Sequence, residues 1–277
     1  MKLTLGFSTC PNDTFIFDAM VHNKIDTQDF KFDLFLADVE ELNKLAFKNN
    51  IDITKISFHA YAKISDNYKI LDSGSALGNN NGPLLISKHK IYPDEINDLH
   101  IAIPGENTTA NLLLNIAYPN VKQKTEYLFS DIEEAVLTNE VDAGLIIHET
   151  RFTYQKKGLK KIIDLGEYWE NETKLPIPLG GIIISNKITP ENQKKINTIL
   201  RNSIEYAFKN PAESYDFVKK YAQEMDYEVM KNHIELYVNN YTKSLGKHGK
   251  QAINELYKKA IEKKVINYIN NDIFVNV

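Results

Sequence analysis

The chain has little of several residues that particular classes of protein require. Of its 277 residues one is a cysteine, Cys10, so no disulfide can form within the chain and no cysteine cluster can hold zinc. No apolar run reaches the roughly 18 residues that a membrane helix needs, and residues 1–7 turn polar too early for a signal peptide. A net charge of -4 and a pI near 6.0 provide no basic surplus for nucleic acid or an anionic membrane. We therefore expect a cytoplasmic protein whose partners include no nucleic acid and no membrane.

Arginine is almost missing as well, because Arg151 and Arg201 are the only two. Lysine supplies nearly all the positive charge, so Arg151 marks a place where the planar, forked guanidinium was used instead. The histidines include no i, i+4 pair with a glutamate between them, as a helical zinc site would need. The sequence therefore predicts no metal site, and it contains no nucleotide or dinucleotide fingerprint.

What is present is ordinary for a globular protein. The hydrophobic content is 43% and the charged content 25%, and the length is sufficient for two domains. The middle of the chain alternates strand and helix patterns, which is typical of a parallel α/β sheet. After Thr189 the pattern turns helical, and we predict helices over residues 190–209, 211–224, 227–241 and 249–264.

The first predicted strand, residues 2–7, runs into a polar turn. Ser8 opens this turn, and Asn12 lies within it. Asp13 or Thr14 would cap a helix that begins near residue 15. Free N–H groups at such a helix start can bind an anion, although any strand–helix turn has this composition, so both interpretations stay open.

Two later strands also end in polar residues. The strand predicted over residues 51–56 ends with Lys55, which suits an acidic ligand or extends past the sheet edge into solvent. The strand over residues 101–103 leads to Thr108 and Thr109 at the start of another helix. Hydroxyl groups at a helix N-terminus again favour an anionic ligand.

The apolar strand over residues 144–147 ends in His148, with Arg151 close behind. Ligands bind at the carboxyl edge of open α/β sheets, so His148 is the candidate general base. A helix N-terminus nearby would disfavour the imidazolium and keep the ring neutral. A structural histidine at a domain edge is the alternative. Cys10 is either a nucleophile or a packing residue.

Several stretches together resemble one known family, the 1,4-dihydroxy-6-naphthoate synthases of the futalosine route to menaquinone. The longest resemblance lies in the first turn, where Thr9 departs from the proline that is usual in the family. The stretches, which together span nearly the whole chain, are residues 5–17, Thr54–Ser57, Pro104–Gly105 with Thr108–Ala110, Gly144–Tyr154, Asp164–Glu167 and Pro176–Gly181.

The resemblance implies an α/β fold like that of the type 2 periplasmic binding proteins. Such a fold has two lobes joined by two crossings, and here the C-terminal region would be helical. We expect residues 1–86 and 186–277 to form the larger lobe and residues 87–185 the smaller one. The ligand would lie in the cleft between the lobes.

The resemblance also implies a lyase that converts cyclic dehypoxanthine futalosine to 1,4-dihydroxy-6-naphthoate without a metal or an organic cofactor. His148 matches the family's proton acceptor. Lys55, Ile56 and Ser57, and Thr109 with Ala110, match its substrate-binding segments, so the partner would be a small-molecule carboxylate. From position alone, the cleft would also include Ser8, Asn12, Asp13, Thr14, Thr108 and Arg151.

Two other functions stay open at this point. One is the sibling enzyme of the same fold and pathway, chorismate dehydratase, although residues 148–154 favour the synthase. The other is a small-molecule-binding protein in the cytoplasm with no catalytic activity. The sequence leaves the oligomeric state open, with a homodimer as one option, and does not identify the general acid.

Overall fold

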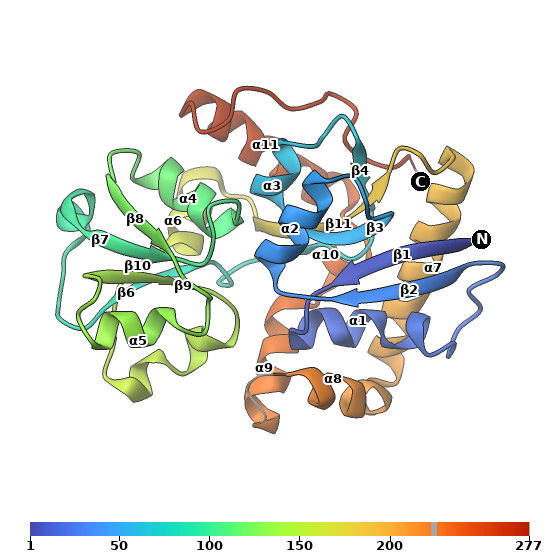
Figure 1. Cartoon of the computed structure of the whole chain (residues 1–277), viewed down its shortest axis with the longest axis horizontal. Helices are drawn as coiled ribbons and strands as arrows, with labels where there is room; N and C mark the ends of the chain where they lie inside the picture. Colours follow the sequence, from blue (N-terminus) through green and yellow to red (C-terminus); the bar gives the residue numbers. More distant parts are fainter. Residues whose placement is uncertain (223–225, 277) are drawn as a thin grey trace.

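Two β-sheets form the centres of two α/β lobes in the computed structural model, which describes residues 1–222 and 226–276 (Figure 1). The first sheet has the order β2-β1-β3-β11-β4, with β5 paired to β11. Its strands are β1 (Lys2–Phe7), β2 (Lys31–Leu36), β3 (Ile53–Ser57), β4 (Tyr68–Ile70), β5 (Ala76–Gly78) and β11 (Ile177–Ser185). Strands β1, β2 and β3 are parallel, whereas β11 runs antiparallel to β3, β4 and β5.

The second sheet has the order β10-β6-β9-β7-β8 and forms the other lobe. Its strands are β6 (Leu84–Ser87), β7 (His100–Ile103), β8 (Gln123–Glu126), β9 (Ala143–Ile146) and β10 (Lys160–Asp164). Strand β7 is parallel to β8 and β9, but β6 is antiparallel to both β9 and β10. The parallel pairing predicted for the middle of the chain is found among β7, β8 and β9, whereas β6, and β11 in the first sheet, run in the reverse direction because each enters from the other lobe.

The chain crosses between the lobes twice. The first crossing lies between β5 and β6, and the second lies between β10 and β11. Strand pairing assigns residues 84–86 to the second sheet and residues 177–185 to the first, whereas the predicted lobe boundaries lay at 86/87 and 185/186.

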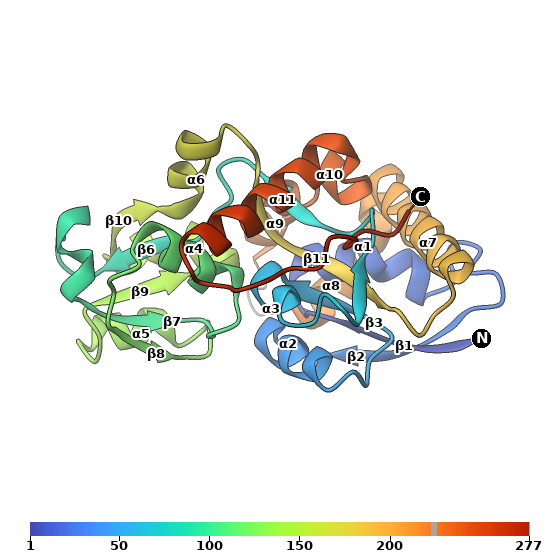
Figure 2. The same ribbon diagram turned by 90° about the horizontal axis from the view of Figure 1, so that it is seen from above.

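Helices cover both sheets, and the C-terminal helices lie against the larger lobe (Figures 1 and 2). The smaller lobe carries α4 (Thr109–Ala117), α5 (Ile132–Leu137) and α6 (Leu165–Thr173). The larger lobe carries α1 (Pro11–Val21), α2 (Val39–Phe47), α3 (Phe58–Ala62), α7 (Pro190–Lys209), α8 (Tyr215–Tyr221), α9 (Tyr227–Tyr237), α10 (Asn240–Lys243) and α11 (Gly246–Glu262). Short 3₁₀ helices are η1 (Pro93–Asp98), η2 (His148–Phe152), η3 (Tyr154–Lys157) and η4 (Pro211–Ser214). The helices predicted over 211–224 and 227–241 are each divided into two shorter elements, and residues 223 and 224 lie outside the described part of the chain.

The first helix begins earlier than predicted. Cys10 is the N-cap, with ψ 148°, and Pro11 is the first helical residue. Proline suits this position because its fixed φ is helical and the first N–H of a helix needs no partner. Asp13 and Thr14, which were predicted to cap the helix, therefore lie in its first turn.

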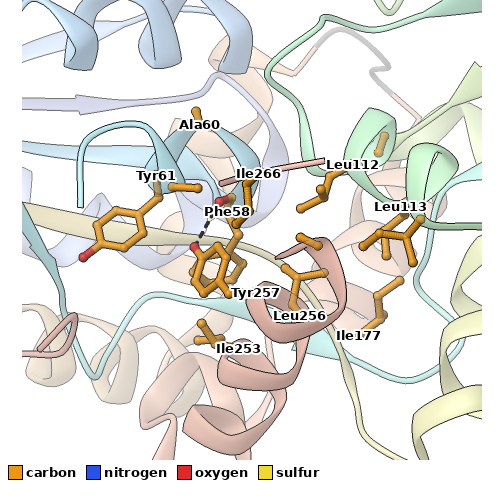
Figure 3. Packing of buried hydrophobic residues seen from close by; sticks show 14 of the residues in the cluster. Phe58, Ala60, Tyr61, Leu112, Leu113, Ile177, Ile253, Leu256, Tyr257 and Ile266 are labelled. Atoms are coloured by element: carbon orange, nitrogen blue, oxygen red, sulfur yellow. Dashed lines mark hydrogen bonds between the residues drawn. The ribbon is translucent and has the colours of Figure 1, made fainter. Parts of the chain in front are cut away.

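One apolar cluster runs through both lobes and joins them (Figure 3). Leu112 and Leu113 of α4 belong to the same cluster as Leu256 of α11. The hydroxyl of Tyr257, also on α11, donates to the carbonyl of Phe58 at 2.9 Å. Figure 2 shows α11 reaching from the larger lobe toward α4. The lobes are thus held together by a continuous core on one side of the cleft, which leaves the other side for a ligand.

Candidate active site

A cavity lies between the lobes at the carboxyl ends of β1, β3 and β9. This is where open α/β sheets place their ligands. Its walls combine polar side chains from both lobes with a band of aliphatic ones. They are formed by Ser8, Asn12, Asp13, Val39, Lys55, Ile56, Ser57, Ala76, Asn81, Pro83, Thr108, Thr109, Ala110, Ile147, His148, Leu179, Gly180, His233 and Tyr237.

The turn between β1 and α1 is organised around the carboxylate of Asp13, which is fully buried. Its Oδ2 accepts from the hydroxyl of Ser8 at 2.7 Å and from the Ser8 N–H at 3.2 Å. Its Oδ1 accepts from the amide of Asn12 at 2.8 Å. These bonds satisfy the carboxylate and hold Ser8 and Asn12 at the cavity wall.

Lys55 of β3 forms an ion pair with Asp13, with Nζ 2.9 Å from Oδ1. The lysine is 7% exposed, so its side chain does not extend past the sheet edge into solvent. A buried charge without its partner typically costs 3–5 kcal/mol. Lys55 therefore lines the cavity as half of a neutral pair rather than as a free cation.

Ser57 ends β3 and lies opposite Gly180 of β11 in the strand ladder. Its N–H donates to the side-chain oxygen of Asn43 at 3.0 Å, and its hydroxyl accepts from the Asn43 amide at 3.2 Å. The hydroxyl therefore keeps its own proton available for a ligand in the cavity. Ile56, between Lys55 and Ser57, contributes to the apolar part of the wall.

His148 is the first residue of η2 and lies two residues beyond β9. Its φ of 59° is left-handed, a backbone conformation that non-glycine residues rarely adopt outside functional sites and tight turns. The ring lies against Phe129, with centroids 5.0 Å apart, and its Nδ1 is 3.5 Å from the sulfur of Cys10. The helix that follows is a short 3₁₀ helix that begins at His148 itself, so the predicted effect of a separate helix N-terminus on this ring lacks its structural basis.

His233 is the main cavity residue that the sequence analysis missed. It lies on α9, is fully buried, and contacts the side-chain oxygen of Asn12 through Nε2 at 3.0 Å. Its ring is nearly parallel to that of His148, with an angle of 14° and centroids 6.1 Å apart. Tyr237, one helical turn later, packs on His233 and also lines the cavity. No local motif marks these residues, since Asn12 and His233 are 221 positions apart.

The N-terminus of α4 forms the opposite wall. Thr108 is its N-cap, and its hydroxyl accepts from the N–H of Asn111. The hydroxyl of Thr109 donates to the carbonyl of Leu179 and accepts from the N–H of Phe58 at 2.9 Å, so it joins the lobes. Among residues 1–222 and 226–276, the backbone N–H groups of Thr109 and Ala110 form no hydrogen bond to a protein acceptor. These two N–H groups are therefore the free donors of this wall.

Two predicted cleft residues lie outside the cavity. The hydroxyl of Thr14 donates to the carbonyl of Cys10, which stabilises the first turn of α1. The guanidinium of Arg151 donates to the carbonyl of Gly82 and to Asp164, at 3.3 Å for the latter. Arg151 therefore holds the first crossing against the smaller lobe rather than lining the cleft.

A second group of polar contacts joins the lobes beside the cavity. Asn107 donates to Glu40 at 2.6 Å and accepts from Lys63 at 2.6 Å. Burial raises the pKa of Glu40 above its usual 4.5, against the lowering effect of the amides of Asn107 and Asn43. Burial lowers the pKa of His59 to about 4, and the charge of Lys63 acts in the same direction. Glu40 and His59, which lie where the lobes meet, therefore have pKa values that depend on the burial produced by this contact.

Neither a metal site nor a membrane segment appears in the part of the chain that the structure describes. In that part, no three His, Cys, Asp or Glu side chains are placed so that they could hold a metal ion. No described helix has the length and apolar character needed to cross a membrane. The expectation that the protein works without a metal or cofactor stays a prediction.

Comparison with known proteins connects this geometry to a family. A family model described as "Menaquinone biosynthesis" matches residues 3–262. A "1,4-dihydroxy-6-naphtoate synthase" from Thermus thermophilus is 40% identical over 258 residues, which cover 93% of each chain. A protein of the same name from Streptomyces coelicolor is 36% identical and covers 98% of this chain and 96% of its own.

Solved structures agree on the fold. A protein from Archaeoglobus fulgidus superimposes with a TM-score of 0.91 at 37% identity, covering 96% of this chain and 98% of its own. The ligand-binding component of an ABC-type import system from Staphylococcus aureus gives a TM-score of 0.74 at 13% identity, covering 100% of this chain and 96% of its own. The second likeness shows the fold alone, and it confirms the expected two-lobed architecture of the periplasmic-binding-protein type.

Proposed function

Because the chain belongs to the menaquinone-biosynthesis family, we propose that it is a carbon–carbon lyase that converts cyclic dehypoxanthine futalosine to 1,4-dihydroxy-6-naphthoate. The observation that carries this proposal is the identity to two synthases over nearly the whole chain. The cavity supports it, because it brings hydrogen-bonding groups and an imidazole together between the two lobes. We further propose that the enzyme works in the cytoplasm and that its partner is this small carboxylate, with no nucleic acid or membrane involved.

His148 is the general base of the proposed reaction. A neutral imidazole accepts a proton near neutral pH, and His148 lines the cavity with one nitrogen facing the Cys10 sulfur. Removal of a hydroxyl proton from the substrate starts carbon–carbon cleavage, and formation of the second aromatic ring favours the product. General-base catalysis of this kind typically contributes about 10² to 10⁴ in rate.

The substrate carboxylate binds at the N-terminus of α4. The backbone N–H groups of Thr109 and Ala110 have no protein acceptor among the described residues, and helix N-termini favour anions. The alternative cation, Lys55, is neutralised by Asp13 at 2.9 Å. Lys55 and Ser57 instead hold hydroxyl groups of the substrate, while Ile56 and Leu179 contact its apolar ring.

The decisive experiment is a mass spectrum of the product formed from cyclic dehypoxanthine futalosine. Wild-type protein should form 1,4-dihydroxy-6-naphthoate, and His148→Ala should form at most about one hundredth as much per unit time. A parallel incubation with the substrate of chorismate dehydratase tests the sibling activity. Recovery of both compounds unchanged after hours, with the ligand bound, would instead support a binding protein.

A further inference from the structure

The cavity contains a second imidazole, and the proposed reaction so far gives it no role. His233 lines the same cavity as His148, and their rings are nearly parallel at 6.1 Å. His148 comes from the smaller lobe, whereas His233 comes from α9 on the larger one. Docking of the lobes therefore places two proton-accepting rings at one substrate site.

Hydrogen bonding determines which nitrogen of His233 carries a proton. The amide nitrogen of Asn12 donates to Asp13 at 2.8 Å. The reversed amide would place two acceptor oxygens in contact, so the oxygen of Asn12 must face Nε2 of His233, 3.0 Å away. Because an amide oxygen can only accept, Nε2 carries the hydrogen. In the neutral ring, Nδ1 is then the nitrogen that carries no hydrogen.

This chain of hydrogen bonds is anchored deep in the larger lobe. Asp13 is fully buried and is fixed by Lys55 and by both donors of Ser8. Asp13, Asn12 and His233 therefore form a row of carboxylate, amide and imidazole. A buried group behind a histidine commonly sets its tautomer and orientation in acid–base catalysis.

On the basis of the proposed function, we propose that His233 is a second catalytic residue, one that exchanges a proton with the substrate through Nδ1. Cleavage requires two proton transfers. His148 removes a hydroxyl proton, the O–H electron pair becomes a C=O bond, and the pair of the broken C–C bond passes to the departing carbon. Protonated at Nδ1, His233 gives that carbon a proton.

The same residue also completes the 1,4-dihydroxy ring. A ring carbon beside a carbonyl loses a proton to Nδ1 of the now neutral His233. The carbonyl oxygen takes up the proton that His148 had gained. The two steps restore both histidines, and they need no oxidant, reductant or further reactant.

The test uses the full-length protein with His233→Ala, and with His248→Ala as a matched control. His248 is exposed and bonded to Tyr241 on the surface, so its loss should leave turnover unchanged. We expect kcat of His233→Ala to fall by at least about 10²-fold, as for loss of an acid–base group, while KM changes little. Added imidazole should restore turnover in proportion to its concentration, and substituted imidazoles should do so according to their own basicity.

A second variant separates chemistry from packing. His233→Gln keeps a side-chain donor near Asn12 but has no nitrogen that exchanges a proton at neutral pH. It should be as slow as His233→Ala, and it decides the question alone if the alanine variant does not fold. Near-wild-type kcat in either variant, or a loss in His233→Ala that no imidazole restores, would overturn the inference. Failure of the wild type itself to convert the substrate would instead remove the proposed function.

Discussion

His59 makes the stability of the protein depend on pH in a way that the structure allows us to calculate. The ring lies on α3, is 6% exposed, and faces the segment that leads into α4 of the other lobe. Burial is the main cause of its low pKa, which is about 4 against an ordinary 6.5. Lys63 and, more weakly, Lys124 add repulsion toward a charged ring. The folded protein therefore holds His59 neutral where the unfolded chain protonates it.

The direction in which folding stability changes with pH follows from which state, folded or unfolded, binds the proton at His59. Between pH 6.5 and about 4 the unfolded chain binds a proton at His59 that the folded chain does not bind. Folding stability must therefore fall on acidification across this range. A difference of about 2.5 pH units at about 1.36 kcal/mol each corresponds to about 3 kcal/mol. Above pH 6.5 the residue contributes no pH dependence, and below pH 4 the loss levels off.

Urea unfolding followed by circular dichroism at pH 7.5, 6.5, 5.5 and 4.5 would measure this effect. Between pH 7.5 and 4.5, His59→Leu should lose about 2.5 kcal/mol less stability than wild type, because this range covers most of the interval between 6.5 and about 4. Glu40 and the other carboxyls are present in both proteins, so their contribution cancels in the difference. His248→Leu, which changes an exposed histidine, should follow the wild-type curve. Parallel pH curves for wild type and His59→Leu would refute the reasoning.

Three further changes have defined outcomes. His148→Ala should lower kcat by at least about 10² while the circular dichroism spectrum and thermal midpoint stay near wild type, because the change removes a base rather than core volume; a turnover number within a few-fold of wild type would contradict the assignment. Thr109→Val should lower the free energy of unfolding by about 1–3 kcal/mol and raise KM, since it leaves the carbonyl of Leu179 without its hydroxyl donor. Thr109→Ser should recover both values in the same chemical denaturation and kinetic assays. Equal behaviour of the two variants would show that the hydroxyl bond between Thr109 and Leu179 does not join the lobes. Gly82→Ala should lower the melting temperature, because a Cβ there would overlap the backbone of Gly166; calorimetry showing an unchanged midpoint would show that the crossing can move aside.

Much of the site could be predicted because parallel strands deliver their carboxyl ends to one edge. The polar residues after β1, β3, β7 and β9 were recognisable from the sequence as strand exits, and most of them line the cavity. The detailed geometry was less predictable. Helix α1 begins at Pro11, before Asp13 and Thr14, so these two residues lie in its first turn and do not cap it as predicted.

The tertiary partners could not be predicted from local patterns. The hydrogen bond from His233 to Asn12 joins residues 221 positions apart, and α9 carries no feature that distinguishes His233 from a core histidine. Arg151 stood out in the sequence as one of two arginines, but no local pattern indicated its partners, the carbonyl of Gly82 and the carboxylate of Asp164.

The pairing of Lys55 with Asp13 bears on where the proposed substrate carboxylate binds. At 2.9 Å the two charges compensate each other, so Lys55 does not present an unpaired cation to the cavity. This favours the proposed site at the start of α4, where backbone N–H groups bind an anion without a full positive charge. The same Asp13 carboxylate accepts from Asn12, whose oxygen faces Nε2 of His233, so the ion pair and the second imidazole belong to one hydrogen-bonded row. A substitution at Asp13 would therefore disturb both Lys55 and His233, which makes the surface control His248→Ala the cleaner comparison for His233→Ala.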